Sequence, residues 1–473
     1  RWTMSRDNKV VATLSDAIRR SGLKDGMCVS FHHHLREGDR VLNFVLDECA
    51  RLGIKNLKVN ASALMACHRP ILERIKDGTV SHIECNYMHK ALGGPISKGL
   101  LESEVIFRSH GGRPAALTRG ESVIDVAFIA ASTADRAGNC NGREGKAAFG
   151  SIGYAMPDAE MANHVVIMTD HLVEYPLSTA SIDERHVDSV VVVDSIGDPE
   201  KIMSGTTRIT RDPVGLLIAD YAAKAILASG LLMDGFSFQT GAGGISLAVA
   251  HYLGALMREE QVTGSFASGG ITGTLVDLHE EGLFEKLLDV QCFDRDAVAS
   301  IGKNTMHREI SASTYASPAS KSAVVDHLDV VILGATEIDT NFNVNVHTDS
   351  NGIIMGGSGG HSDTAAGSKL SIIVAPLMRA RLPLIVDRVS TISTPGSDVD
   401  LLVTQFGMAC HPDNNELRLR LLDANLPVFS MEALKDKAES LTGIPVRRLP
   451  EGRRVASVIS RDGVLLDTIK ARV

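Results

Sequence analysis

Residues 329–345 read DVVILGATEIDTNFNVN, and residues 125–141 read DVAFIAASTADRAGNCN. Each copy begins with an aspartate and continues with an apolar run of strand length. The same polar positions then recur in both copies, namely Asp135, Asn139 and Asn141 in the first and Asp339, Asn343 and Asn345 in the second. A short apolar run bounded by turn residues is typical of a strand buried on both faces, as in a parallel sheet. The match predicts that one strand and its following turn occur twice.

A longer unit repeats in the same order around these segments. Residues 14–59 follow the pattern helix, Asp-Gly turn, buried strand, polar loop, helix and strand, and residues 222–266 repeat it. Two matches in one order indicate a domain duplication. We therefore predict an α/β fold of two tandem, related open sheets with helices on both faces, residues 1–208 and 209–473, joined near 206–213. Ligands are expected at the carboxyl ends of the strands.

Composition excludes several function classes. The chain has 473 residues, of which 44% are hydrophobic and only 4% aromatic, which suits two or three domains built from aliphatic side chains. A net charge of −9 argues against a nucleic-acid binder. The seven cysteines form no CxxC pair, the start is polar, and no apolar run is long enough to cross a membrane. We expect a cytoplasmic protein with free thiols.

The second half holds two glycine clusters that are candidate ligand loops. Their residues are Gly241, Gly243, Gly244, Gly357, Gly359, Gly360 and the adjoining His361. The later cluster follows a short predicted strand at 353–355, and the earlier one lies between a predicted strand and a predicted helix. Glycine lets backbone N–H groups approach a ligand, although a tight surface loop is the alternative interpretation. Ser246 replaces the third glycine of a dinucleotide-binding loop, so no nicotinamide cofactor is expected.

The first half holds a histidine-rich loop, His32-His33-His34, directly after a predicted strand. Consecutive loop residues rarely converge on one metal ion, so we expect no metal there. Together with Arg36, the first two histidines suit a carboxylate-bearing substrate, and Arg113 has the same character. A solvated polar loop is the alternative.

The duplicated halves and these loops resemble the coenzyme A transferase superfamily. The resemblance rests on the loop 239–244, the block 341–371 and the segment TPGSDVDLLVTQFGMA at 394–409. Within the superfamily, the segment SFHHHLREGD at 30–39 resembles the citrate lyase alpha subunit family. The likeness covers nearly the whole chain and implies two coenzyme A transferase-like open sheets.

The resemblance also implies an activity and partners. Citrate would displace acetate from an acetyl thioester on the phosphoribosyl-dephospho-coenzyme A group of a small gamma subunit, the acyl carrier, or from a coenzyme A thioester. A beta subunit would then cleave the citryl thioester. The chain itself would bind no cofactor, would join an oligomer, and would contact neither nucleic acid nor membrane.

One departure from the superfamily bears on the mechanism. Members that form a covalent intermediate carry a glutamate just after the strand that follows the glycine loop. Here that strand continues into residues 267–270, which read ASGG, and Gln405 replaces a second glutamate usual in its block. We therefore expect the citrate carboxylate to attack the acetyl thioester directly, through a mixed anhydride. Such a route needs two anions held together and an oxyanion stabilised by backbone donors, worth about 3 kcal/mol each.

The expected roles follow from this route. The residues expected at the pantetheine arm and thioester are Gly357, Gly359, Gly360 and His361. Backbone N–H donors for a carboxylate or oxyanion are expected from Gly241, Gly243 and Gly244. The residues expected to bind the acyl group, in place of the glutamate, are Ser268, Gly269 and Gly270. The residues expected to bind citrate carboxylates are His32, His33, Arg36 and Arg113. The asparagines at 341, 343 and 345 suit either a structural or a ligand-binding role.

Two other functions remain open from the sequence. The chain could be a covalent coenzyme A transferase of another carboxylic acid, with Glu337 or Glu309 as nucleophile. It could also be a small-molecule sensor without catalysis, because related α/β halves serve that role.

Overall fold

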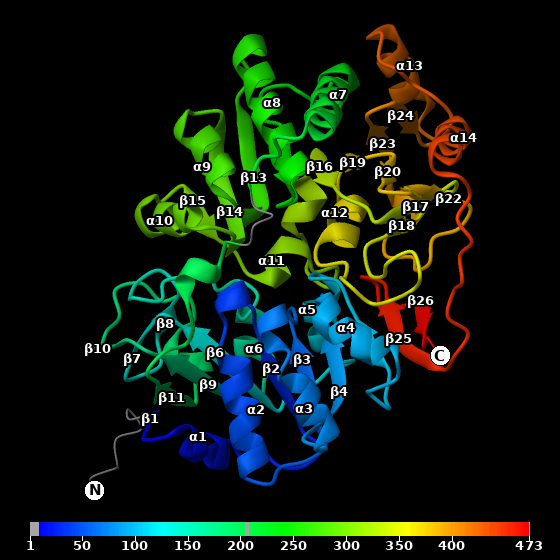
Figure 1. Cartoon of the computed structure of the whole chain (residues 1–473). Coiled ribbons are helices and arrows are strands. Elements are labelled where there is room, and N and C mark those ends of the chain that lie inside the picture. Colours follow the sequence, from blue (N-terminus) through cyan, green and yellow to red (C-terminus); the bar gives the residue numbers. More distant parts are fainter. Residues whose placement is uncertain (1–8, 204–207, 473) are drawn as a thin grey trace, which may run out of the picture.

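The computed structural model describes residues 9–203 and 208–472, and it contains two large sheets, one above the other in Figure 1. The lower sheet, drawn in blue to teal, comes mainly from the first half of the chain, and the upper sheet, in green to orange, comes from the second. Residues 206 and 207 of the predicted joint lie outside the described residues. The second half begins with helix α7 at Pro213.

The elements have the following bounds. The lower sheet contains, in spatial order, β1 (Val10–Val11), β11 (Ser189–Val192), β9 (His164–Thr169), β6 (Val126–Ala131), β2 (Cys28–Phe31), β3 (Leu57–Ala61), β4 (Val80–Cys85), β5 (Val105–Phe107), β25 (Arg454–Ile459) and β26 (Leu465–Lys470). The upper sheet contains β15 (His307–Glu309), β14 (Phe284–Cys292), β13 (Gly264–Ile271), β12 (Ser237–Thr240), β16 (Val330–Leu333), β19 (Leu370–Val374), β23 (Leu401–Thr404) and β24 (Gly407–Cys410). The short strands are β7 (Thr133–Asp135), β8 (Cys140–Asn141), β10 (Leu172–Val173), β17 (Glu337–Asp339), β18 (Val344–Asn345), β20 (Met378–Arg379), β21 (Leu382–Pro383) and β22 (Ile385–Val386). The helices are α1 (Leu14–Ser21), α2 (Val41–Arg51), α3 (Ile71–Lys76), α4 (Lys90–Ser97), α5 (Gly112–Arg119), α6 (Met156–Met161), α7 (Pro213–Ser229), α8 (Gly244–Glu260), α9 (Gly273–Glu280), α10 (Arg295–Lys303), α11 (Ala312–Ala316), α12 (His361–Gly367), α13 (Asn415–Asp423) and α14 (Met431–Thr442).

The two sheets share one strand order, which confirms the predicted duplication. Seven strands run β11-β9-β6-β2-β3-β4-β5 in the lower sheet and β23-β19-β16-β12-β13-β14-β15 in the upper sheet. All of these neighbours pair in parallel. The central strands β2, β6, β16, β19 and β23 are buried at every residue, so both faces of each sheet are covered, as the fold prediction required.

The aspartate that opens each repeat fixes the neighbouring strand. A carboxylate oxygen of Asp125, just before β6, accepts a hydrogen bond from the backbone N–H of Cys28 at 2.8 Å. Asp329, just before β16, accepts one from Ser237 at 2.9 Å. Each aspartate therefore accepts a hydrogen bond from the first backbone N–H of the neighbouring strand. This shared structural role explains why the sequence match begins at an aspartate.

The polar residues after each repeated strand are also structural. Asp339 accepts hydrogen bonds from the backbone N–H groups of Asn341 and Asn343, and Asp135 does the same for its own turn. The side chain of Asn345 accepts from the N–H groups of the two residues that begin the next turn. The side chains of Asn343, which donates to Asp339, and of Asn345 therefore hold the turn, which is the structural one of the two roles left open by the sequence.

The last two strands cross between the predicted halves. Strand β25 pairs in parallel with β5 of the lower sheet, and β26 pairs with β25, so the hairpin from residues 454–470 extends the sheet of the first half (Figure 1, red). Apart from this hairpin, the lower sheet is built only from residues before Pro213. The crossing ties the two halves together at a second point besides the joint.

The predicted strand at 353–355 is absent from the structure. Ile354 makes only an isolated bridge to Thr348, and its backbone N–H donates to the Ser97 hydroxyl at 2.9 Å. Its carbonyl oxygen lies so close to Gly93 that a Cβ on that residue would fall 2.2 Å from it. The segment is therefore packed against helix α4 of the first half, and contacts with that half take the place of strand pairing.

The remaining sequence-based expectations concern cysteines and membranes. All seven cysteines are free. No helix within residues 9–203 and 208–472 has both the length and the hydrophobicity that a membrane crossing needs.

Candidate functional site

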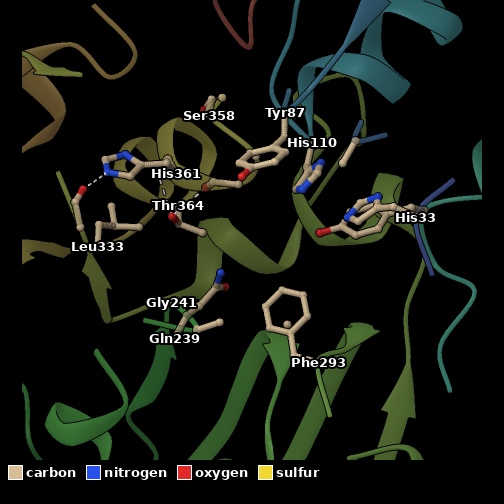
Figure 2. A pocket seen from close by; sticks show the side chains of 18 of the residues that line it. His33, Tyr87, His110, Gln239, Gly241, Phe293, Leu333, Ser358, His361 and Thr364 are labelled. Carbon is tan, nitrogen blue, oxygen red and sulfur yellow. Dashed lines mark hydrogen bonds between the residues drawn. The ribbon is translucent and has the colours of Figure 1, made fainter. Parts of the chain in front are cut away.

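A cavity of about 350 Å³ lies between the two sheets, at the carboxyl ends of their strands. The first half contributes residues that directly follow β2, β3, β4 and β5, and the second half contributes residues at or after the ends of β12, β13, β14 and β16. Figure 2 shows side chains from both halves around this space. The position agrees with the rule that parallel sheets bind ligands at the carboxyl ends of their strands.

Rings form much of the first-half wall. His33 stacks on Tyr154 with ring centroids 5.5 Å apart, and His110 lies 4.3 Å from the same tyrosine ring. The Nδ1 atom of His33 is 2.7 Å from the Ser62 hydroxyl. Burial, and then the neighbouring His110, lowers the pKa of His33 well below its ordinary value. Burial also lowers the pKa of His110, to about 3, so both imidazoles are neutral at neutral pH.

Arg36 places a cation at the cavity wall. Its guanidinium lies over the ring of Phe293 at 4.7 Å, and its Nη1 atom is buried without a hydrogen-bond partner. The residue has a left-handed backbone, with φ of 49°, within the turn that follows β2. Glu37 fixes that turn, because its carboxylate accepts hydrogen bonds from the N–H groups of Ala66 and Cys67. A buried guanidinium with an unused donor is suited to bind a carboxylate.

Gln239 is the main polar side chain of the second-half wall. Its amide oxygen accepts a hydrogen bond from the Ser268 hydroxyl at 3.0 Å, and its amide nitrogen donates to the Tyr315 hydroxyl at 2.8 Å. These two hydrogen bonds therefore fix the orientation of the Gln239 amide. Gly269, with φ of +98°, lies against this amide, and a Cβ there would fall 2.5 Å from it. Glycine is thus needed on β13 to leave room for Gln239.

The glycine loop at 356–360 packs tightly on the first half. A Cβ on Gly357 would lie 2.2 Å from the carbonyl oxygen of Asn86, and the N–H of Gly359 donates to that same carbonyl. The carbonyl of Gly359 in turn accepts from the N–H of His110 at 2.8 Å. These contacts require glycine, because a side chain would force the two walls apart.

His361 begins α12 at the end of this loop. Its Nε2 atom is 2.8 Å from the carbonyl of Gly334, and its Nδ1 atom is 2.7 Å from the Thr394 hydroxyl. Burial lowers the pKa of His361 to about 4, so the ring is neutral, donates to the carbonyl and accepts from the hydroxyl. Figure 2 shows this ring turned toward the end of β16.

Asp363 joins the halves behind the cavity. Its carboxylate accepts hydrogen bonds from the Ser109 hydroxyl and the Gly111 N–H, both at 2.8 Å. Arg461, from the crossing hairpin, donates to the same carboxylate at 3.3 Å. The loop that carries His110 is therefore held by a residue of the second half.

The structure brings a large part of the predicted site residues together. Those that line the cavity are His33, Arg36, Gly241, Gly270, Gly357, Gly359, Gly360 and His361. Those that lie away from its lining are His32, Arg113, Gly243, Gly244, Ser268 and Gly269. The roles given to these residues stay predictions. Their positions divide them into residues that line the cavity and residues that lie outside its lining.

Arg113 and His32 belong to a buried network behind the first-half wall. The two terminal nitrogens of Arg113 donate to the two carboxylate oxygens of Asp158, at 2.5 and 2.8 Å, and its Nε donates to Asn60. His32 lies 2.8 Å from the same carboxylate. Burial alone would raise the pKa of Asp158, but Arg113 and His32 outweigh it and hold that pKa below its ordinary value. Arg113, His32 and Asp158 form hydrogen bonds with one another, so they support the cavity wall from outside its lining.

Several wall residues received no individual role from the sequence. They are Tyr87, His110, Tyr154, Gln239, Phe293 and Tyr315. Gln239 and Phe293 could have been found, because each lies at or one residue past the end of a repeated strand. Tyr87 and Tyr154 lie in connecting segments and Tyr315 lies in the short helix α11, and none of them belongs to a motif.

Both glutamates of the covalent alternative are engaged elsewhere. Glu337 accepts hydrogen bonds from Asn345, Ser390 and Arg447. Glu309 accepts from the backbone N–H of Ile152 at 2.7 Å and from a serine hydroxyl. Among the residues in the two described ranges, the cavity is lined by no aspartate or glutamate. The structure thus offers the covalent route no carboxylate at the cavity wall.

One buried group has the side chains of a metal site. Asp289, Cys292 and His307 have ligand atoms within 4.8 Å of one another. A carboxylate oxygen of Asp289 already lies 2.7 Å from His307 Nε2 and accepts from the Cys292 thiol at 3.0 Å. Burial, and then Asp289, raises the pKa of that thiol well above its ordinary value. A protonated thiol in a closed hydrogen-bond cluster accounts for the group without a metal ion.

Comparison with known proteins places the chain in one family. Residues 7–472 match the family model described as "Citrate lyase, alpha subunit (CitF)". The citrate lyase alpha chain of Escherichia coli (strain K12) is 51% identical over 465 residues, which cover 98% of this chain and 91% of that protein.

Solved structures support the same placement. The alpha subunit of citrate lyase from Streptococcus mutans, crystallised in complex with citrate, superposes with a TM-score of 0.97 at 46% identity, covering 100% of this chain and 93% of that one. A 4-hydroxybutyrate CoA-transferase from Porphyromonas gingivalis superposes with a TM-score of 0.59 at 19% identity, covering 92% of this chain and 98% of that one. The second likeness concerns the fold alone, and it confirms the predicted coenzyme A transferase-like architecture.

Proposed function

The chain belongs to the citrate lyase alpha subunit family, a transferase component of citrate lyase, and on that premise we propose that it exchanges acetate for citrate on an acyl-carrier thioester. The acetyl thioester on the carrier's phosphoribosyl-dephospho-coenzyme A group is the acyl donor. The product, a citryl thioester, passes to a beta subunit for cleavage, and the carrier is a gamma subunit. Assembly into an oligomer and a cytoplasmic location stay predictions.

The observation that carries this proposal is the pairing of two unlike walls around one cavity. From the first half, Arg36 offers a substrate carboxylate a guanidinium donor that has no other hydrogen-bond partner. From the second half, the glycine loop and Gln239 offer a thioester surroundings that hold no carboxylate among the described lining residues. A site that holds an anionic nucleophile beside a thioester provides the positioning that acyl exchange needs.

We propose a direct route without an enzyme-bound acyl group. A citrate carboxylate oxygen attacks the acetyl carbonyl, the C–O bond forms, and the C–S bond breaks to release the thiolate. The thiolate then attacks the citryl carbonyl of the mixed anhydride, forms the citryl thioester and releases acetate. Arg36 orients the attacking carboxylate, and backbone N–H groups of the glycine segments stabilise the oxyanion of each addition. The absence of a carboxylate from the described cavity lining supports this route over a glutamyl intermediate.

The test uses the full chain with an acetylated acyl-carrier subunit. Citrate-dependent release of acetate, with formation of the citryl carrier, is the expected result. Tight citrate binding without release would favour the sensor alternative. Hydride trapping of a glutamyl adduct after incubation with the acetylated carrier would overturn the direct route and leave the transferase function in place.

A further inference from the structure

Citrate carries more negative charge than the cavity lining carries positive charge. Within the part of the chain that the structure describes, Arg36 is the one Lys or Arg that lines the cavity. Citrate has three carboxylates, all of them ionised at slightly alkaline pH. An uncompensated charge in a partly buried site costs several kcal/mol. A second counter-charge is therefore required for a tricarboxylate to bind well.

His33 and His110 form the nearest group that could supply it. Their rings are stacked at 17° with centroids 6.1 Å apart, and Figure 2 shows them next to one another on one side of the cavity. The Nδ1 atom of His110 is buried and has no hydrogen-bond partner. Both rings contact Tyr154, whose aromatic face can stabilise an imidazolium.

We propose that His33 and His110 form a second carboxylate subsite, which takes up one proton from solvent when a di- or tricarboxylate binds. The inference rests on the proposed function, because it takes citrate as the occupant, and it assigns the citrate carboxylates to two places. Arg36 holds one carboxylate by permanent charge. The histidine pair holds another by a charge that exists only in the complex.

The surroundings explain why the pair is neutral without ligand. The other titratable side chains that line the cavity are Arg36, Tyr87, Tyr154, Tyr315 and His361. The nearby carboxylate of Asp363 is already engaged by Ser109, Gly111 and Arg461. Behind the pair, the positive charge of Arg113 also opposes protonation of His110. The described neighbours thus leave an imidazolium without a free anion, and the ligand's carboxylate supplies the missing one.

The sign of the pH dependence follows from this arrangement. Burial lowers the pKa of each histidine in the free protein, and a bound carboxylate raises the pKa of the pair. Between these two values, binding one citrate takes up one proton. Citrate affinity should then fall about tenfold for each unit of rising pH within that window. A monocarboxylate held by Arg36 alone should show no such fall.

The experiment is calorimetry of the full chain with citrate at about pH 7.5, in two buffers of different ionisation enthalpy. Uptake of about one proton per citrate is expected, and uptake near zero is expected for acetate. H110Q and H33Q should each remove this uptake and weaken citrate binding about tenfold or more, while acetate binding is kept. His82, an exposed histidine outside the cavity lining, gives the control variant H82Q, which should behave as the native chain. Circular dichroism checks that each variant is folded.

The outcomes separate this inference from the proposed function. Citrate binding and acetate release without proton uptake would overturn the histidine subsite and leave the transferase function standing. Full uptake in both H110Q and H33Q, or equal uptake with acetate, would overturn the subsite as well. Failure of both citrate binding and acetate release in the native chain would remove the proposed function and the subsite together.

Discussion

The two halves of the chain share a strand order but give the cavity different chemistry. The first half contributes imidazole rings and one guanidinium, from His33, His110 and Arg36. The second half contributes an oriented amide and closely packed glycine backbone, from Gln239 and the loop at 356–360. Strand pairing fixes the sheets, whereas the residues just past the strand ends are free to differ.

Under the proposed function, this difference assigns the two substrates to different walls. A guanidinium with an unused donor attracts a carboxylate, and a glycine-rich wall with no carboxylate among its described lining residues suits a neutral thioester arm. In that proposal, each half of the duplicated fold binds one reactant. The comparison can be tested by damaging one wall at a time.

The largest effect is expected from Asp158→Asn, which disturbs the support of the first-half wall. The change leaves the buried Arg113 without its counter-charge and should destabilise the protein by about 3–5 kcal/mol. The folded-state pKa of Asp158 is depressed, so its stabilisation is present above the unfolded pKa near 4 and is lost as pH falls further. Thermal unfolding at neutral and acidic pH measures this.

The control for this change is Asp413→Asn, because the Asp413 side chain is 94% exposed. The midpoint difference between Asp158→Asn and the native chain should be large at neutral pH and should shrink in acid. A difference that stays constant with pH would show that the carboxylate charge is not what holds the wall.

Arg36→Gln removes the cation of the first-half wall. Losing a charged hydrogen bond to citrate should cost about 3 kcal/mol, or roughly a hundredfold in kcat/KM for citrate. Acetyl thioester binding should change little, because that substrate is assigned to the other wall. Steady-state kinetics with citrate varied, then with acetylated carrier varied, measures the split. Arg69→Gln, at a neighbouring exposed arginine, is the control.

Gly357→Ala damages the opposite wall. The added Cβ would lie 2.2 Å from the Asn86 carbonyl oxygen, so the glycine loop must shift. We expect about a tenfold or larger loss of kcat/KM for the acetylated carrier, with a smaller change for citrate. Gly243→Ala is the matched control, since a Cβ there meets nothing within 4 Å and the backbone N–H is kept. Equal losses in both variants would argue against a special role for the loop packing.

Ser268→Ala should have the smallest effect. Its hydroxyl donates to Gln239 but does not line the cavity, so the loss of one hydrogen bond, worth about 1 kcal/mol, should lower kcat/KM about fivefold. Ser265→Ala on the same strand removes a hydroxyl that donates to a backbone carbonyl and serves for comparison. A loss approaching that of Arg36→Gln would mean that Ser268 contacts substrate directly.

The fold could be predicted because its evidence is local and repeated. The apolar strands β6 and β16 are each preceded by an aspartate with one structural task, so the duplication survives in the sequence. The crossing hairpin could not be predicted. Strand β25 pairs with β5, which lies far away in the chain, and a strand's partner is not encoded in its own pattern.

The candidate site was accessible only where it adjoins a motif. His33, Arg36 and the glycine loop lie next to predicted strand ends, and the structure places them around one cavity. Arg113 looked like a free cation, but its partner Asp158 lies on another helix, and sequence alone does not show that pairing. Tyr154 comes from a connecting segment and Tyr315 from the short helix α11, so their convergence is a property of the three-dimensional packing.

Oxygen transfer in a single turnover tests the direct route most closely. The full chain, in molar excess over the acetylated carrier subunit, is mixed with that carrier and with citrate whose carboxylates carry ¹⁸O, and the released acetate is analysed by mass spectrometry. The direct route predicts one ¹⁸O in each acetate, because the bridging oxygen of the mixed anhydride comes from citrate and leaves with the acetyl group. Unlabelled acetate, with ¹⁸O instead on a carboxylate of the protein, would contradict it.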